Sequence, residues 1–186
     1  NRVGFIGETG SGKSTLIEVL LKHIKPNSGS VEHGSDLTVA YFDQLRKQLN
    51  LQKSVFDNVA GGSDFVELGD QKIHVISYLK RFLFDPERVR SPASSLSGGE
   101  RNRLLLAKIL SQPFSILVLD EPTNDLDIEM LEVLEAMLLD YAGTLLMVSH
   151  DRAFINHVAT SILAFNDEGK IEEFVGGYDD YVRQIS

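Results

Sequence analysis

A glycine-rich segment near the start of the chain constrains its fold more than any other feature. Gly7-Glu8-Thr9-Gly10-Ser11-Gly12-Lys13-Ser14 follows a short apolar run at residues 3–6 and precedes apolar residues at helical spacing in residues 13–23. Glycines let backbone N–H groups converge on an anion, and a following helix adds the positive end of its dipole. An apolar strand, this loop and a helix, in that order, predict a phosphate-binding loop in an α/β domain.

The side chains at the end of this loop fit a nucleotide bound with a metal ion. We expect the Lys13 ammonium to contact the β- and γ-phosphates, the Ser14 hydroxyl to ligate Mg²⁺ and the Thr15 hydroxyl to lie near the α-phosphate. The sequence contains no Asn/Thr-Lys-x-Asp element that would read guanine, which favours ATP over GTP. The predicted phosphate-binding residues are Gly7, Glu8, Thr9, Gly10, Ser11, Gly12, Lys13, Ser14 and Thr15.

Two later apolar runs end in side chains suited to phosphoryl transfer. Residues 116–119 lead into Asp120 and Glu121, and residues 144–148 lead into Ser149 and His150. Near-continuous apolar runs predict parallel strands buried on both faces, and such sheets present ligands at their carboxyl ends. We therefore expect Asp120 at the Mg²⁺ ion, Glu121 to polarise the attacking water, and His150 to contact the γ-phosphate or orient that water.

Two further segments complete the predicted site. Gln44 follows the strand-like residues 37–42, and we interpret it as a contact to Mg²⁺ or water that reports the nucleotide state to the rest of the chain. Ser97-Gly98-Gly99 precedes a predicted helix at residues 99–112 and forms a second anion-binding arrangement. One domain gains little from two such arrangements, whereas two domains packed head to tail would each close the other's ATP.

The remaining pattern indicates one α/β domain of 186 residues that carries an insertion. We expect a core with a mostly parallel sheet from residues 1–44 and 113–186. A mostly helical subdomain at about residues 45–112 contains a hairpin at 65–68 and 72–75 and a helix at 75–84. Ile128, Leu131, Leu134 and Leu138 predict the buried stripe of another helix, and residues 161–165 and 170–174 a closing hairpin. Because the chain starts at Asn1, we interpret it as a piece of a longer polypeptide.

Composition narrows the possible partners. The formal charge is −9, so the domain as a whole is a poor candidate for broad binding to phosphate backbones. No apolar run approaches the roughly 18 residues of a membrane span, and no signal peptide opens the chain. The absence of cysteine excludes disulfides and thiolate metal sites. We therefore expect a cytoplasmic protein without membrane insertion.

The ordered set of motifs resembles the ATP-binding cassette (ABC) family over essentially the whole chain. The resemblance implies a P-loop NTPase fold, with residues 7–14 as Walker A, Gln44 as the Q-loop and residues 96–100 as the signature. It also implies Asp120 and Glu121 as Walker B and the catalytic glutamate, residues 124–127 as the D-loop and His150 as the switch histidine. The implied activity is Mg²⁺-dependent hydrolysis of ATP to ADP and phosphate, and the implied partner is a second cassette.

Finer details resemble the ABC-F subfamily of tandem cassettes without membrane domains. Residues 97–103, 120–127 and 149–152 carry this similarity, and residues 41–44, 74–84 and 175–178 look most like the second cassette of the Uup group. The resemblance implies a ribosome-associated role, with the ribosome, RNA or branched DNA bound through regions outside this chain. In this family the aromatic residue that stacks on adenine and the linker between cassettes also lie outside residues 1–186.

Three alternatives remain open at the level of sequence. An ATPase subunit of a membrane transporter shares every motif. ATPases of DNA repair and chromosome organisation share them too, but usually place a long coiled coil between phosphate loop and signature. A nucleotide-gated nucleic-acid-binding module with little turnover is the third alternative, against which Glu121 and His150 argue.

Overall fold

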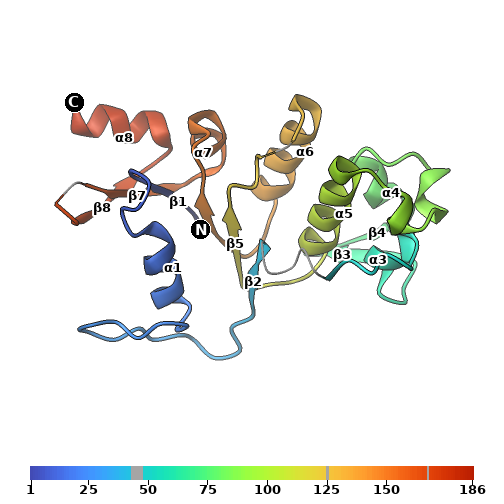
Figure 1. Cartoon of the computed structure of the whole chain (residues 1–186), viewed down its shortest axis with the longest axis horizontal. Coiled ribbons are helices and arrows are strands. Elements are labelled where there is room, and N and C mark those ends of the chain that lie inside the picture. The colour runs from blue at the N-terminus through green and yellow to red at the C-terminus, as the bar shows by residue number, and fades with distance from the viewer. Residues whose placement is uncertain (43–47, 125, 167) are drawn as a thin grey trace. The chain divides into compact units, whose positions relative to one another are not determined.

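The computed structural model describes residues 1–42, 48–124, 126–166 and 168–186. The chain divides into two compact units, drawn in Figure 1. The first contains Asn1–Tyr41, Phe114–Thr123 and Gly143–Ser186, and the second contains Phe42–Pro113 and Asn124–Ala142. Residues 124–142, which the sequence places with the core, thus group with the inserted segment. The predicted domain limits stay a prediction.

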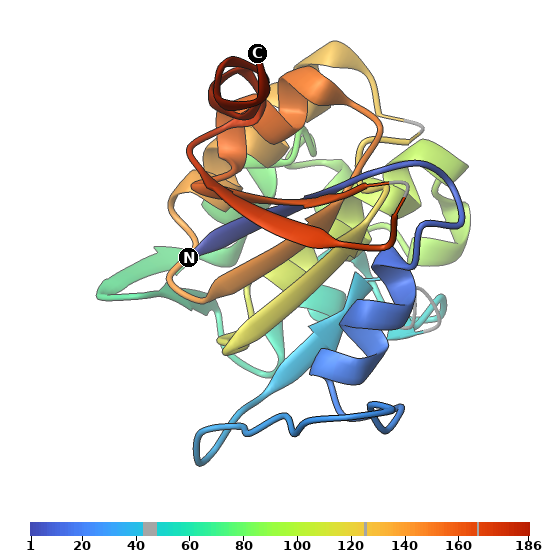
Figure 2. The same ribbon diagram turned by 90° about the vertical axis from the view of Figure 1, so that its left-hand side faces the viewer.

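The first unit is built on a six-stranded sheet with the order β2-β5-β6-β1-β7-β8. Its strands are β1 (Arg2–Ile6), β2 (Val39–Tyr41), β5 (Ile116–Asp120), β6 (Thr144–Val148), β7 (Ser161–Phe165) and β8 (Ile171–Val175). All neighbouring pairs are parallel except β7 and β8. Figure 2 shows the strands side by side. The predicted α/β fold with a mostly parallel sheet is confirmed.

Three helices complete this unit: α1 (Lys13–Leu20), α7 (Arg152–Val158) and α8 (Tyr178–Ile185). The core packs Phe5 of β1 and Ile17 of α1 against apolar residues of β5 and β6. The central strands β5 and β6 are almost wholly buried, which explains their continuous apolar sequences. Helix α1 ends three residues earlier than predicted, because Lys22 adopts a left-handed backbone (φ 63°) that a helix cannot continue.

The second unit contains the predicted hairpin and helices. Its elements are α3 (Val55–Ala60), β3 (Phe65–Leu68), β4 (Gln71–His74), α4 (Val75–Arg81), the 3₁₀ turns η2 (Arg88–Arg90) and η3 (Ala93–Ser95), α5 (Gly98–Leu110) and α6 (Ile128–Leu139). The Tyr78 side chain of α4 is fully buried, and its hydroxyl donates to the Ala107 carbonyl of α5 at 2.7 Å. Burial raises the pKa of Tyr78 far above its ordinary value, so the hydroxyl stays protonated as this bond requires.

The predicted burial of one residue in helix α6 is wrong. Ile128 was expected in the buried stripe of α6, but its side chain is 79% exposed in the first turn of the helix. Met130 is buried in its place, together with Leu134 and Leu138. The sequence spacing fits both residues, because helical periodicity does not show how far along a helix its packing surface extends.

Candidate nucleotide-binding site

The glycine-rich loop follows β1 directly and turns on backbone conformations that favour glycine. Gly10 and Gly12 have φ values of 84° and 98°, and Gly12 is the N-cap of α1. At Gly7 (φ 149°) an added Cβ would lie 2.8 Å from the Cβ of Phe165, so a side chain has no room there. The first N–H groups of α1 have no partner within the helix. The loop is therefore a cradle of backbone donors suited to an anion.

The Lys13 side chain extends from the start of α1 back to the carbonyl groups of this loop. It is only 9% exposed, and its Nζ donates to the carbonyls of Gly7 at 2.8 Å and Glu8 at 2.7 Å. A third contact joins Nζ to the Ser11 hydroxyl at 3.3 Å. Three neutral oxygens leave the positive charge unneutralised, and the ammonium stays at the centre of the loop, where a phosphate would be bound. Ser14 follows it in the first turn of α1 and is exposed.

Glu121 and His150 follow adjacent strands of the sheet, and the structure brings them together. The backbone N–H of His150 donates to both carboxylate oxygens of Glu121, at 3.1 and 3.2 Å, and the His150 Nε2 lies 3.5 Å from Oε1. Glu121 itself has a left-handed backbone (φ 46°), which is uncommon for a residue with a side chain and marks strain at this corner. Its amide donates to the Val148 carbonyl at 2.8 Å. The glutamate is thus fixed by the end of β6.

Asp120 ends β5 and is half-buried, opposite Val148 of β6 in the sheet register. Within the described ranges, no group of three or more acidic or histidine side chains is close enough to form a metal site made of protein alone. Mg²⁺ is typically held by one or two protein ligands together with phosphate oxygens and water. Asp120 and the Ser14 hydroxyl are donors of the kind it prefers, so these residues fit an ion that arrives with a nucleotide. Gln44, the third predicted ligand, lies outside the described residues.

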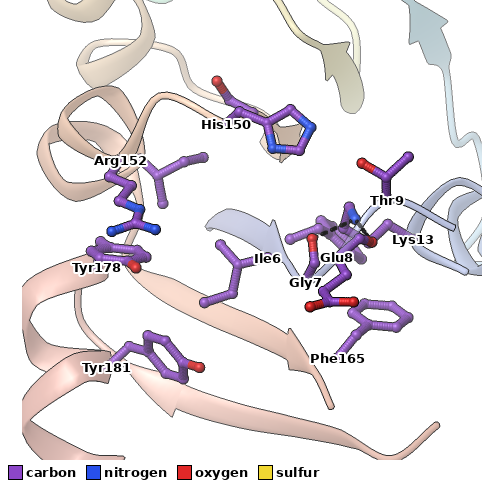
Figure 3. Close-up of a pocket in the computed structure, with 13 residues that line it drawn as sticks. Ile6, Gly7, Glu8, Thr9, Lys13, His150, Arg152, Phe165, Tyr178 and Tyr181 are labelled. Carbon is purple, nitrogen blue, oxygen red and sulfur yellow. Dashed lines mark hydrogen bonds between the residues drawn. The ribbon is translucent and has the colours of Figure 1, made fainter. Parts of the chain in front are cut away.

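A cleft of about 660 Å³ opens beside the phosphate loop (Figure 3). One wall consists of predicted site residues from the loop and of Ser149 and His150. The other wall carries aromatic and cationic side chains that sequence reasoning had not singled out: Arg152, Phe165, Tyr178 and Tyr181. The Arg152 guanidinium lies 5.3 Å from the centre of the Tyr178 ring. The only sequence signal for this wall was the similarity of residues 149–152 and 175–178 to one subfamily.

A close helix junction places the two tyrosines at the cleft. An added Cβ at Gly177, the N-cap of α8, would lie 2.7 Å from the Asn156 carbonyl of α7. The Asn156 amide donates to the Asp179 carboxylate at 3.1 Å, and its oxygen accepts the Asp179 N–H at 2.9 Å. Glycine is therefore required for the close approach that brings α8 against α7.

The Ser-Gly-Gly segment lies in the second unit at the start of α5. Ser97 caps the helix by accepting the Glu100 N–H at 3.2 Å, and the Glu100 carboxylate accepts the Ser97 N–H at 2.8 Å. The Ser97 amide thereby lowers the pKa of Glu100, burial opposes this shift, and Arg88, 3.2 Å away, lowers the pKa further. Ser97, Gly98 and Gly99 are exposed. This capping box predefines the N-terminus of a 13-residue helix.

Comparison with known families identifies the domain. The model of the family described as ABC transporter matches residues 1–124, two thirds of the chain. The chain belongs to the ABC family. The matched stretch includes the cradle at residues 7–14. No helix within the described ranges is long and apolar enough to span a membrane.

Similar curated proteins agree with the predicted Uup group. The chain is 51% identical over 184 residues to an ATP-binding protein Uup-like of Haemophilus influenzae, and 47% identical over 180 residues to the ATP-binding protein Uup of Escherichia coli. It is 42% identical to the energy-dependent translational throttle protein EttA of H. influenzae. These matches cover 96–99% of this chain but only 28–40% of the relatives.

Solved structures support the fold. An archaeal ribosome recycling factor, aABCE1, solved in complex with the ribosomal stalk protein aP1, aligns with a TM-score of 0.71 and 25% identity. The alignment covers 99% of this chain and 37% of that one. A putative metal-chelate type ABC transporter aligns with a TM-score of 0.63 at 22% identity, which shows the fold alone.

Proposed function

We propose that this chain hydrolyses ATP to ADP and phosphate with Glu121 as the residue that polarises the attacking water. The observation that carries the proposal is the position of the Glu121 carboxylate at the carboxyl edge of the sheet, held by the His150 N–H. Strand β6 lies between β5, which leads into Glu121, and β1, which leads into the phosphate loop, and because these strands are parallel both features lie at the same end of the sheet.

The residues divide the work as phosphoryl transfer requires. The loop N–H groups and Lys13 bind the phosphates, with the ammonium exchanging the loop carbonyls for phosphate oxygens. The Glu121 carboxylate accepts a hydrogen bond from the attacking water. The oxygen of that water then bonds to the γ-phosphorus, while the bond between this phosphorus and the leaving ADP oxygen breaks. His150, 69% exposed beside Glu121, is placed to donate to a γ-phosphate oxygen. Mg²⁺, held by Ser14, Asp120 and Gln44, would supply charge neutralisation.

We further propose that Ser97, Gly98 and Gly99 act on the ATP of a second cassette in a head-to-tail pair. Their exposed helix N-terminus supports this role, because exposed donors are available to a partner. We also propose a cytoplasmic, ribosome-associated role. The names of two similar proteins, a translational throttle and a ribosome recycling factor, support the link to translation. Identity of 41–51% to Uup and EttA proteins favours this role over that of a transporter subunit.

The test is phosphate release by Glu121→Gln, with ATP affinity measured separately by titration of a fluorescent ATP analogue. Glutamine keeps the size and one acceptor oxygen of glutamate, so we expect normal affinity and a rate lower by about 10²–10³-fold. Lys13→Ala should abolish binding, which validates the titration. The matched control is Glu172→Gln, because Glu172 is exposed on β8 of the same sheet.

Hydrolysis by Glu121→Gln at the parental rate would show that another group polarises the water. A parental chain that binds ATP but releases no phosphate, even with a second cassette present, would instead support the nucleotide-gated binding module.

A further inference from the structure

Positive charge is concentrated in one segment of this acidic chain. Residues 42–113 carry eleven of the 18 lysines and arginines but only eight of the 27 acidic residues. This segment therefore has an excess of three positive charges, whereas the rest of the chain, including the six acidic residues that residues 124–142 add to the same unit, has an excess of twelve negative ones. Such an asymmetry indicates where an anionic partner would be attracted.

Within this segment, five side chains form a continuous row, which we call the cation–aromatic row: Lys72, Phe65, His74, Phe56 and Arg90. The Lys72 Nζ lies 4.9 Å from the centre of the Phe65 ring, and the His74 ring meets Phe65 edge-on at 5.5 Å. The row continues through Phe56, 6.4 Å from His74, to the Arg90 guanidinium, 4.4 Å from the Phe56 ring. Its residues belong to the hairpin of β3 and β4, to α3 and to η2, all within the second unit. Figure 1 labels the hairpin and α3.

Phe65 breaks the alternation of its hairpin. The neighbouring Val66 is 4% exposed and faces the core of the unit, so the side of the hairpin that carries Phe65 is the outer one. A polar residue is expected there, yet the Phe65 ring is 43% exposed. Phe56, only 6% exposed, anchors the other end of the row in the core. The row thus presents one exposed ring on a rigid base.

The two cations of the row are available to an anion. Lys72 lies opposite Glu67 in the strand register, but its ammonium is placed over Phe65. Neither Lys72 nor Arg90 forms an ion pair with any carboxylate of the described ranges, whereas the neighbouring Arg88 is paired with Glu100 at 3.2 Å. Both side chains are exposed.

We propose that the cation–aromatic row binds single-stranded nucleic acid, with an unpaired base stacked on Phe65 and backbone phosphates on Lys72 and Arg90. An exposed ring flanked by cations is the arrangement by which proteins hold single strands, because every base offers a π face and every nucleotide a phosphate. A duplex would offer its phosphates but would leave the ring without a partner. We choose RNA over DNA, and that choice alone rests on the ribosome-associated role proposed above.

The experiment measures fluorescence anisotropy of labelled 12-mers of oligouridylate and oligothymidylate with the chain and its variants. We expect Phe65→Leu, which keeps apolar area but loses the ring, to weaken RNA binding roughly tenfold, and Phe65→Trp to preserve it. Lys72→Ala should reduce the slope of log affinity against log salt by about 0.7. Lys25→Ala removes the same charge from an exposed site in the first unit and should change the slope little. Glu67→Gln should strengthen binding, because it removes the carboxylate opposite Lys72.

Equal affinity of Phe65→Leu and the parental chain for both oligonucleotides would overturn the stacking role. Displacement of RNA by polyglutamate of the same charge and length, at the same concentration as unlabelled RNA, would assign the row to an acidic protein partner and overturn the proposal. Tighter binding of thymidylate would retain the stacking surface and overturn the choice of RNA. ATP hydrolysis by the same variants is measured in parallel. Loss of RNA binding with normal hydrolysis separates this inference from the proposed function, and thermal unfolding confirms that each variant is folded.

Discussion

At the scale of single residues, two carboxylates are held in position by hydrogen bonds from backbone N–H groups. Glu121 is held by the His150 N–H and Glu100 by the Ser97 N–H. Such bonds orient a carboxylate without neutralising it, so it can still interact with a second group. For Glu121 we propose that the second group is water, and for Glu100 it is the Arg88 guanidinium.

The substitution Glu100→Gln tests how much the carboxylate held by the Ser97 N–H stabilises helix α5. The folded chain lowers the pKa of Glu100, so its carboxylate stabilises the fold above the unfolded pKa, and this stabilisation is lost as the pH falls through the lower folded value. We expect the variant to be less stable by about 0.5 kcal/mol at neutral pH, with the difference from the parental chain vanishing in acid. Urea unfolding over a pH series measures it. Glu87→Gln, at an exposed carboxylate of the same unit, is the control, and a pH-independent difference would contradict the electrostatic cause.

At the scale of elements, the sequence predicts helices and strands best where burial produces a run of apolar residues or where a helix cap has recognisable residue types. The strands 116–120 and 144–148 were predictable because both faces are buried, and α5 because Ser97 and Glu100 form a capping box. Helix α8 was not predicted: Tyr178, Tyr181, Val182 and Ile185 do fall at helical spacing, but the helix has only eight residues and none of them is buried. The bond from the His150 amide to Glu121 leaves no sequence signal, since any residue provides an N–H. The aromatic wall of the cleft combines residues from β7, α7 and α8, which only the fold brings together.

Because α8 has no buried residue, its position should depend on polar contacts to α7. Asn156→Ala removes both bonds to Asp179, so we expect amide hydrogen exchange in residues 178–185 to accelerate roughly tenfold, with little change in the central strands. Mass spectrometry of proteolytic fragments after exchange measures the effect. Arg183→Ala, which changes an exposed side chain of the same helix, should leave the exchange close to parental. Unchanged exchange in Asn156→Ala would mean that the aromatic contacts of Tyr178 and Tyr181 and the bond from Gln184 to the Val175 carbonyl are sufficient to hold α8.

At the scale of the whole molecule, the two predicted anion-binding segments belong to two different units. The phosphate loop belongs to the first unit and the start of α5 to the second. In a head-to-tail pair each ATP would be held by the loop of one copy and by Ser97, Gly98 and Gly99 of the other. Two copies with a charge of −9 each repel, so association should require Mg-ATP and should strengthen as salt screens the repulsion.

The solution mass of Glu121→Gln, measured by light scattering on a sizing column, tests this pairing. Slow hydrolysis should let ATP accumulate between two copies, so we expect a dimer with Mg-ATP and a monomer with Mg-ADP. Ser97→Ala in the same background should weaken the dimer without changing ATP affinity, because Ser97 would contact only the partner's nucleotide. Since that change also removes the helix cap, Gly98→Ala serves as a second variant: no atom lies within 4 Å of its added Cβ in this chain, so a weaker dimer would reflect a clash with a partner. A monomer with saturating Mg-ATP would show that this chain does not pair with itself and that the proposed partner is a different cassette.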